Sequence, residues 1–393
     1  MKRRIKSLLF LTIAILIITI NASADLGIED RVQSYLIGDF DSGRVLESYN
    51  IDKPLQAASV SKLMTYLVVK DAVKEGKLNL NDRVTVTLEI EAVGGSSLNL
   101  LEGEVLTVDE LLAGLMVVSG NDAAYALAVK TAGSEKAFTD LMNAKAQELE
   151  LKSSKFYNSS GLQEGANQNT MSTEDIFKLS RHIIEKYPEV LEYSKIKILN
   201  MPKRNFTGES TIPLVGEIPG VDGLKTGFTE EAGYCLVSTI DARKSPQSGE
   251  FRLITIVMGT ADISERSELS KFLINYGLEN YGMRTIIDDK APYSEVTINS
   301  AVNPRVPLYP TESYRILTPK AKRYVYKSEI NDGLKAPISV GEKVGTMTLS
   351  SEGEDIITVD LIVKHDVEQA NLFTRIIRAI ENTFRTIATM IRQ

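Results

Sequence analysis

The sequence has very few of the residues on which disulfide, zinc and histidine chemistry depend. Its 393 residues include one cysteine and two histidines. Cys235 alone cannot form an internal disulfide. His182 and His365 stand far apart in the sequence with no other ligand-like residues clustered beside them, which argues against the usual kinds of zinc site. Both histidines suit structural or surface positions, so we expect neither a histidine-based triad nor a metal.

A strongly basic surface is also missing. The formal net charge is −7, and outside the two ends of the chain no basic stripe stands out. A nucleic-acid partner is therefore not expected. The apolar content of 43% and the charged content of 25% are typical of a globular protein with a substantial core. A chain of 393 residues is too long for one ordinary domain, so two or three domains are expected.

The first 24 residues have the composition of a secretory signal. A basic start, Lys2-Arg3-Arg4, is followed by the apolar run Leu8–Ile20 and then by Asn21-Ala22-Ser23-Ala24, which suits a signal peptidase. The apolar run is short for a membrane span. We predict that residues 1–24 are a signal peptide and that the chain is exported. An uncleaved anchor is the alternative.

Residues 25–284 alternate between helical and strand-like patterns, which predicts an α+β domain. The pattern indicates an antiparallel sheet with helix clusters on both sides. A capping box, Thr107 to Glu110, marks one helix start. The expected elements are a hairpin over 34–48, helices after Ser59, from Thr107, from Ala123 to Ala132, over Ser172–Ile184 and over Ser264–Tyr281, and strands over Arg83–Leu88, Tyr234–Ile240 and Phe251–Met258.

The character of the sequence changes near residue 288. Short strand-like runs separated by proline and glycine predict a small all-β domain over residues 288–367. Residues 371–393 have a helical period instead, with apolar residues on one face and arginines elsewhere. A basic amphipathic helix suits the surface of an anionic membrane. Packing of this helix on the body of the protein or on a partner is the alternative.

A serine and a lysine three residues apart stand at the start of an expected helix, in Ser59-Val60-Ser61-Lys62. Residues three apart lie on one helix face, so the amine would lie beside the hydroxyl. This is one way to activate a serine without a histidine. The helix start also leaves the Ser59 N–H able to point at a developing oxyanion. Such pairs are common on amphipathic helices, so the spacing alone does not define a catalytic site.

Two further motifs follow in order. Ser119-Gly120-Asn121 lies at a break between two expected helices, where side chains can project into a cleft. Lys225-Thr226-Gly227 precedes the strand expected from Tyr234, and we expect it on an edge strand. There a lysine and a hydroxyl can receive a substrate carboxylate, and the glycine permits close backbone approach. Each motif alone is common, whereas the three in this order are specific.

The ordered motifs S-x-x-K, S-G-N and K-T-G resemble those of the penicillin-recognising serine enzymes. More narrowly, the chain resembles the low-molecular-mass penicillin-binding proteins that are D-alanyl-D-alanine carboxypeptidases. The likeness includes the order of signal peptide, catalytic domain, β domain and amphipathic anchor. It implies the transpeptidase fold that these proteins share with β-lactamases. The similar stretches are Gly43–Tyr66, Gly95–Ala128, Phe156–Leu162, Val221–Val237 and Arg266–Gly277.

The resemblance implies catalytic roles for the matching residues. Ser59 would be the nucleophile and Lys62 its general base, acting unprotonated. Burial and a nearby ammonium group would lower the pKa of that lysine. Ser119 would relay a proton to the leaving amine, and Asn121 would position Lys62 or the peptide amide. The backbone N–H groups of Ser59 and Phe228 would form the oxyanion hole.

The resemblance also implies a substrate-binding set along one strand. Lys225 and Thr226 would hold the terminal carboxylate of the substrate, with Gly227 and the backbone of Phe228 beside them. Arg266 matches a family arginine near that carboxylate. No cofactor is implied.

Three positions depart from the family pattern. Phe228 stands where many relatives have histidine after K-T-G, Ala57 replaces the usual proline before Ala-Ser, and Cys235 replaces a polar residue. A backbone donor survives the change at Phe228, but a side-chain role of histidine would not. We interpret Cys235 as a small buried residue. None of the three changes removes a group that the chemistry needs.

These inferences predict a serine enzyme that removes the terminal D-alanine from peptidoglycan pentapeptide stems and that β-lactam antibiotics acylate at Ser59. The predicted location is the periplasmic face of the inner membrane, where residues 371–393 would hold the protein peripherally. Two alternatives stay open. One is a class A-like β-lactamase, which Gly120 disfavours because those enzymes have aspartate there. The other is a weakly active cell-wall-binding shape protein.

Overall fold

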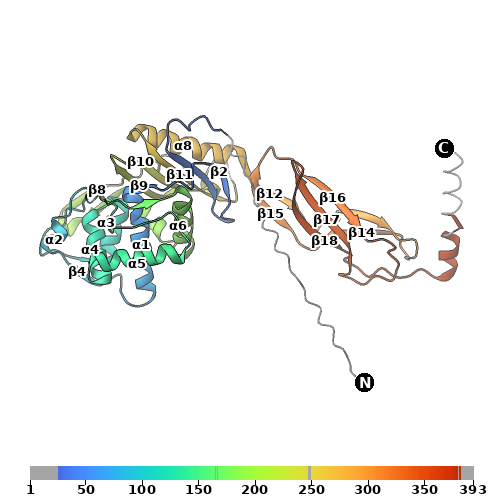
Figure 1. Cartoon of the computed structure of the whole chain (residues 1–393). Helices are drawn as coiled ribbons and strands as arrows, with labels where there is room; N and C mark the ends of the chain where they lie inside the picture. Colours follow the sequence, from blue (N-terminus) through green and yellow to red (C-terminus); the bar gives the residue numbers. More distant parts are fainter. Residues whose placement is uncertain (1–24, 164, 166, 247–248, 379, 382–393) are drawn as a thin grey trace, which may run out of the picture.

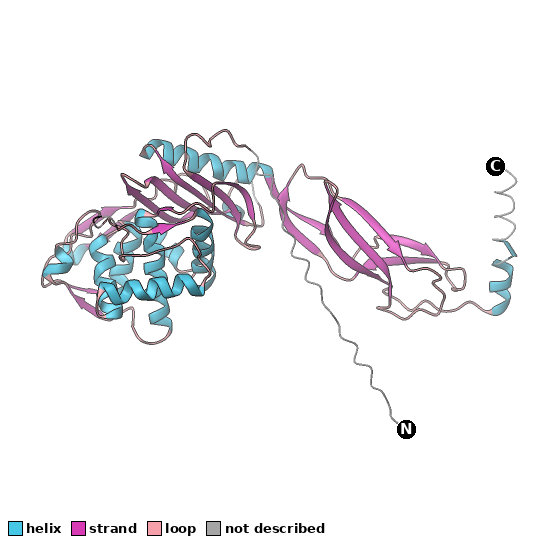
Figure 2. Cartoon of the chain, in the orientation of Figure 1, coloured by secondary structure: helices cyan, strands magenta, loops and turns pink. Residues whose placement is uncertain are grey.

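The computed structural model describes residues 25–163, 165, 167–246, 249–378 and 380–381. The predicted signal peptide and residues 382–393 of the predicted tail helix lie outside the described residues. The chain forms two parts (Figure 1). The first is a sheet with helices on both sides, and the second is an all-β region that extends away from the end of helix α8, Ile263–Asn280 (Figure 2). The predicted α+β fold class is confirmed.

One antiparallel sheet organises the first part. Its strand order is β2-β1-β11-β10-β9, and each neighbouring pair is antiparallel. The hairpin predicted over residues 34–48 is present as β1 and β2, and β9 with the K-T-G motif lies at an edge, as expected. The strands are β1 (Ser34–Asp39), β2 (Val45–Tyr49), β9 (Val221–Thr229), β10 (Gly233–Asp241) and β11 (Arg252–Thr260).

Both faces of this sheet are buried. On β1, Leu36 enters the core shared with the helix cluster, whereas Tyr35 and Ile37 enter the core shared with α8. On β10, Val237 enters the core shared with the helix cluster, and Leu236 enters the core shared with α8. This follows from the alternation of side chains along a strand. Strands buried on both faces need apolar residues at successive positions, which made β10 and β11 visible in the sequence.

The helix cluster carries the S-x-x-K and S-G-N motifs and covers the face of the sheet opposite α8. In α3, Thr107 and Glu110 form the predicted capping box, with reciprocal bonds of 3.1 and 2.8 Å. Ser172 caps α6, also as predicted. The helices are α1 (Lys62–Lys74), α2 (Leu88–Glu91), α3 (Val108–Val117), α4 (Asn121–Ala132), α5 (Glu135–Glu148), α6 (Thr173–Lys186) and α7 (Val190–Ser194).

Several elements were not predicted. Helix α5 buries only a narrow stripe that includes Phe138 and Met142 and is otherwise mostly polar, so it has few apolar residues to mark it in the sequence. The strand expected over Arg83–Leu88 is shorter and gives way to α2. The remaining elements of this part are β3 (Leu55–Gln56), β4 (Arg83–Thr85), β5 (Val105–Thr107), β6 (Thr170–Met171), β7 (Ile198–Met201), β8 (Phe206–Glu209) and the 3₁₀ turns η1 (Ala58–Ser61), η2 (Pro202–Arg204) and η3 (Ala242–Lys244).

The second part begins directly after α8. Strand β12 starts at Tyr281 and pairs with β15, so the predicted boundary between 284 and 288 falls within one strand. The Tyr281 hydroxyl donates to a Glu47 carboxylate oxygen at 2.6 Å, which links the two parts. A further sheet has the order β13-β14-β18-β17-β16. The strands are β12 (Tyr281–Ile287), β13 (Ser294–Thr297), β14 (Arg305–Pro310), β15 (Tyr314–Pro319), β16 (Val325–Ile330), β17 (Lys343–Ser351) and β18 (Glu354–Ile362).

The start of the predicted tail helix lies at the far end of the β region (Figure 1). Its first turn is capped by Asn371, whose Oδ1 accepts from the Thr374 N–H at 2.9 Å. Arg378 donates to the backbone oxygens of Ala301 at 2.6 Å and Val302 at 3.2 Å. Over the described ranges, no helix has the length and apolar content needed to cross a membrane. The exposed apolar residues of the helix are Leu372, Phe373, Ile376, Ile377 and Ile380.

Candidate active site

The Lys62 amine occupies the centre of the site. The side chain is fully buried at the first turn of α1. Its Nζ lies 2.8 Å from Ser59 Oγ, 2.6 Å from Asn121 Oδ1 and 2.9 Å from the backbone oxygen of Ser160. These three oxygens come from η1, from the start of α4 and from the turn after α5. The S-x-x-K and S-G-N motifs therefore meet at one nitrogen atom.

Ser59 is held in the 3₁₀ turn η1, which leads into α1. Ala58 before it has a φ of +44°, in the left-handed region that disfavours a side chain. Gly161 makes this arrangement possible, because a Cβ atom there would lie 1.8 Å from the Ala58 oxygen. On the other side, Gly227 of β9 lies against η1, where an added Cβ would be 3.2 Å from the Val60 nitrogen.

The predicted break between two helices carries Ser119 and Asn121. Helix α3 ends at Val117 and α4 begins at Asn121, while Ser119 between them has a φ of +61°. Ser119 Oγ accepts a hydrogen bond from Lys225 Nζ at 2.9 Å, whereas Asn121 Oδ1 accepts from Lys62. The strained turn thus directs two polar side chains of one short segment toward two different lysines.

Lys225 is fully buried on the edge strand β9, and its Nζ also lies 3.1 Å from the Thr226 oxygen. Thr226 Oγ1 donates to Thr211 Oγ1 at 2.7 Å. The structure therefore brings Ser119, Lys225 and Thr226 together. Their ammonium and hydroxyl groups form a set of donors suited to a carboxylate.

Burial and neighbouring positive charges lower the pKa values of both lysines in the site. Burial lowers the pKa of Lys62 well below its usual value, and the charge of Lys225 lowers it further, against an opposing effect of Asp122. Burial and then the charge of Arg266 lower the pKa of Lys225 to about 7. Both effects favour the unprotonated form of Lys62 beside Ser59, which is the form that its expected role requires.

Phe228 and Arg266 both lie close to the ring of Tyr234. Phe228 is half exposed and stacks on Tyr234, with ring centroids 4.1 Å apart. The Arg266 guanidinium of α8 lies 5.9 Å from the same ring, and the side chain is 7% exposed. Among the hydrogen bonds of the described residues, none joins Phe228 or Arg266 to Ser59 or Lys62. Cys235 is buried, and burial raises the pKa of its thiol to about 11, as suits a packing residue.

The sequence did not point to every group in the site. Ser160 contributes through its backbone oxygen, so its side-chain type carried no signal. Thr211 lies in an irregular segment without a motif, and Asp122 stood next to the S-G-N motif without being singled out. Among the described residues, no cluster of three or more histidine, cysteine, aspartate or glutamate side chains could hold a metal ion.

Two sequence families match this chain. The D-alanyl-D-alanine carboxypeptidase family, Peptidase_S11, matches residues 20–262, and the C-terminal domain of penicillin-binding protein 5 matches residues 281–369. The D-alanyl-D-alanine carboxypeptidase DacF of Bacillus subtilis is 31% identical over 350 residues, which are 88% of each chain.

Solved structures agree with these matches. Penicillin-binding protein 5 from Haemophilus influenzae superimposes with a TM-score of 0.65 at 30% identity, covering 86% of this chain and 98% of that one. Penicillin-binding protein D2 from Listeria monocytogenes in its ampicillin-bound form has a TM-score of 0.57 at 31% identity, covering 63% of this chain and 98% of that one. The fold and the site define a serine enzyme of the penicillin-binding-protein class. The chain belongs to the D-alanyl-D-alanine carboxypeptidase family S11.

The contact between Gly161 and Ala58 predicts a large difference between two glycine substitutions. Gly161→Ala would place a Cβ atom against a backbone oxygen at a φ of +79°, whereas Gly76→Ala has a φ of +71° and open space around it. We expect Gly76→Ala to lower the free energy of unfolding by roughly 1 kcal/mol and Gly161→Ala by roughly 3 kcal/mol or more. Urea denaturation of both variants measures this. Equal losses would contradict the close approach.

Proposed function

We propose that this chain is a serine-type D-alanyl-D-alanine carboxypeptidase that removes the terminal D-alanine from peptidoglycan pentapeptide stems. The observation that carries the proposal is the surroundings of Lys62 Nζ. The oxygens of Asn121 and Ser160 can only accept hydrogen bonds. A neutral amine that donates to both directs its lone pair at the third neighbour, the Ser59 hydroxyl. Such an amine is a general base for that hydroxyl.

Acylation then proceeds without a histidine. Ser59 Oγ forms a bond to the carbonyl carbon of the penultimate D-alanine, and the hydroxyl proton passes to Lys62. The C–N bond to the terminal D-alanine breaks, and the proton reaches the leaving amine by way of Ser119. Lys62 is neutral again, and the shortened stem is held as an ester on Ser59.

Deacylation uses the same groups with water as the nucleophile. Water adds to the ester carbonyl while a proton passes to the neutral Lys62, and the C–O bond to Ser59 breaks as that proton returns to the serine oxygen. Lys225 and Thr226 hold the terminal carboxylate of the substrate during acylation. The backbone N–H groups of Ser59 and Phe228 stabilise the oxyanion in both steps.

The similar proteins support this substrate. The curated relative of Bacillus subtilis is named a D-alanyl-D-alanine carboxypeptidase, and the Listeria monocytogenes structure holds ampicillin. The family names favour the carboxypeptidase over the β-lactamase and shape-protein alternatives. A β-lactam antibiotic presents its ring amide to Ser59 and its carboxylate to Lys225, so it would acylate the same serine.

Replacing the nucleophile tests the proposal directly. We expect Ser59→Ala to abolish covalent labelling by a fluorescent penicillin and to reduce D-alanine release from a pentapeptide by about 10³-fold or more. Ser61→Ala is a matched control, because Ser61 Oγ is buried without a partner among the described residues. Its labelling should equal that of the unaltered chain. Labelling of Ser59→Ala at the normal rate would refute the proposal, as would absence of D-alanine among the products of the unaltered enzyme.

The charge on Arg266 should set the alkaline limit of activity. Lys225 binds the substrate carboxylate as an ammonium ion, so kcat/KM should fall as the pH rises through its pKa of about 7 in the free enzyme. Arg266 lowers that pKa, so Arg266→Gln should move the alkaline limb upward by about one pH unit. Arg266→Lys keeps the charge and should leave the limb near its original position. An unchanged limb in Arg266→Gln would contradict this role.

We propose also that the protein is exported through residues 1–24, that residues 25–284 and 288–367 are its catalytic and β domains, and that residues 371–393 bind the outer surface of the cytoplasmic membrane. The described start of the tail supports the last point. Phe373 and Ile377 lie on an apolar face that is exposed, while Arg378 is bonded to the β region. An apolar helix face flanked by arginines fits an anionic lipid surface.

Two kinds of change test membrane binding. Deletion of residues 371–393 should release the protein from membranes while the purified enzyme keeps its activity. Ile377→Glu should weaken binding to vesicles of anionic lipid by about 10- to 100-fold, since burial of one such side chain contributes roughly 1.5–3 kcal/mol. Thr374→Glu introduces the same charge on the same helix and should have a smaller effect. Continued sedimentation of the deleted form with membranes would count against the proposal.

A further inference from the structure

The side-chain amide of Asn121 is fixed at both ends. Its Oδ1 accepts from Lys62 Nζ at 2.6 Å, and its Nδ2 donates to the Gly94 oxygen at 2.7 Å. The backbone N–H of Asn121 donates to the Ser96 oxygen at 2.7 Å. A carbonyl oxygen can only accept, so Gly94 favours the amide orientation in which Oδ1 faces Lys62. The opposite orientation would place two oxygens together and would turn an N–H group toward the lysine.

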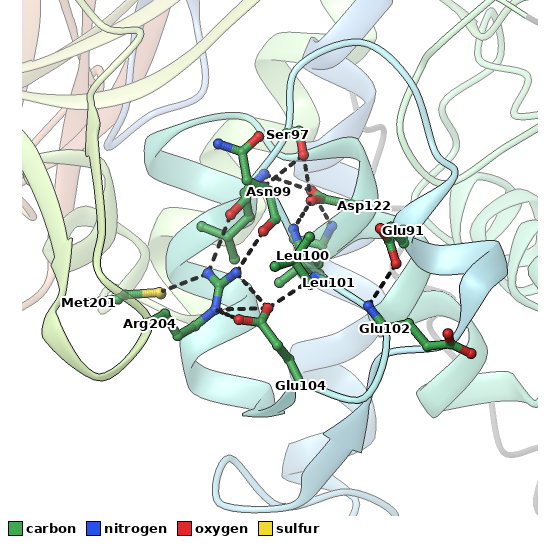
Figure 3. Close-up of polar contacts among 12 residues, drawn as sticks. Glu91, Ser97, Asn99, Leu100, Leu101, Glu102, Glu104, Asp122, Met201 and Arg204 are labelled. Atoms are coloured by element: carbon green, nitrogen blue, oxygen red, sulfur yellow. Dashed lines mark hydrogen bonds and ion pairs between the residues drawn. The ribbon is translucent and has the colours of Figure 1, made fainter.

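The segment that supplies these oxygens lies between α2 and β5. The buried carboxylate of Asp122 accepts hydrogen bonds from it. Both carboxylate oxygens are used: Oδ1 accepts from the Leu98 N–H at 2.9 Å, and Oδ2 accepts from the Leu100 N–H at 3.1 Å and the Ser97 hydroxyl at 2.7 Å (Figure 3). The Ala123 N–H also donates to Oδ1, at 2.8 Å. Asp122 is 1% exposed. A carboxylate fits this place because all of these neighbours donate.

Arg204 of η2 also binds this segment. Its guanidinium donates to the backbone oxygens of Leu98 at 3.3 Å and Asn99 at 2.8 Å, and it pairs with Glu104 at 2.7 Å (Figure 3). Leu98 thus has its N–H bonded to Asp122 and its oxygen bonded to Arg204. The backbone of this segment is fixed on two sides, and its position relative to α4 is set by side chains.

The close fit extends to Gly95, next to the carbonyl that holds the amide. Its φ is +81°, and an added Cβ would lie 2.5 Å from Asn121 Nδ2. A side chain at this position would therefore displace the amide itself rather than the segment's contact with Asp122. This gives a second, independent way to disturb the same hydrogen bond.

We propose that Asp122 is a positioning residue for the Ser59–Lys62 pair. By fixing the segment between residues 94 and 100, it keeps the Gly94 oxygen on the Asn121 amide, which in turn keeps Oδ1 on Lys62 and the amine lone pair on Ser59. The inference rests on the proposed general-base role of Lys62. It assigns to Asp122 and Gly95 an effect on the rate of acylation in addition to any effect on folding.

Asp122→Asn tests this inference, because it replaces one carboxylate oxygen by an NH₂ group. That group cannot accept the hydrogen bonds that the neighbours of Asp122 donate. Single-turnover acylation of the full chain by a fluorescent penicillin should slow by about 10- to 100-fold, part of the 10²–10⁴ that a general base contributes. Glu102→Gln is the matched control: it makes the same acid-to-amide change at an exposed position of the same segment, and its rate should be unchanged.

The pH profile distinguishes positioning from a loss of folded protein. Asp122 and Lys225 are the charged groups that act on Lys62, and the Asp122 charge raises the pKa of that amine. In Asp122→Asn this charge is gone, and a reoriented Asn121 would donate to the neutral amine. Both effects lower the pKa, so the acid limb of acylation should move to lower pH. A merely structural defect would lower the amplitude of labelling and leave the limb in place.

A double-mutant cycle with Asn121→Ala decides whether Asp122 acts through the amide. Without the amide, Asp122→Asn should change the acylation rate by less than about twofold. Gly95→Ala should slow acylation as much as Asp122→Asn does, and its effect should likewise disappear in the Asn121→Ala background. It can therefore replace Asp122→Asn in the cycle if that variant does not fold. Normal acylation in both variants, or equal losses with and without Asn121, would overturn the inference. Acylation of Ser59→Ala would instead overturn the proposed function.

Discussion

The proposed chemistry depends on holding one buried amine against one serine hydroxyl. Burying a lysine is costly unless the group is neutral and its hydrogen bonds are satisfied. Burial and the charge of Lys225 lower the pKa of Lys62, which favours its neutral form, and three oxygens surround its Nζ. These oxygens belong to Ser59, Asn121 and Ser160, which lie on separate elements of the helix cluster. The packing of those elements therefore decides the direction of a single lone pair.

Two residues with positive φ angles, Ala58 and Ser119, lie around this amine. Ala58 precedes the proposed nucleophile, and Ser119 is the proposed proton relay. Such conformations cost about 1–3 kcal/mol each and persist only where the surroundings enforce them. The surroundings here are rigid: α1 is buried along almost its whole length, and Gly161 admits the Ala58 carbonyl where any side chain would collide. The stability of the core thus maintains the geometry of the site.

The sequence predicted the side chains of the three motifs and missed groups that no motif marks, namely the side chains of Asp122 and Thr211 and several backbone oxygens. Ser59, Lys62 and Lys225 stand in spacings whose chemistry is specific once the motifs occur in order. The oxygens of Ser160 and Gly94 could come from any residue, so no spacing revealed them. The same distinction holds for the fold. Strands buried on both faces, such as β10, gave clear apolar runs, whereas β17 alternates buried residues with threonine and serine and was missed.

The lysine of the sheet and the lysine of the helix cluster are linked by one close backbone approach. Strand β9 can lie against η1 because position 227 is glycine, with the Ala57 oxygen 3.1 Å and the Val60 nitrogen 3.2 Å from where a Cβ would stand. That approach places Lys225 near enough to lower the pKa of Lys62. A side chain at 227 would push the strand outward by a few tenths of an ångström and weaken this effect, because Coulomb interactions fall with distance. The pKa of Lys62 therefore depends in part on how the sheet packs on the helices, and Gly227 permits that packing by having no side chain.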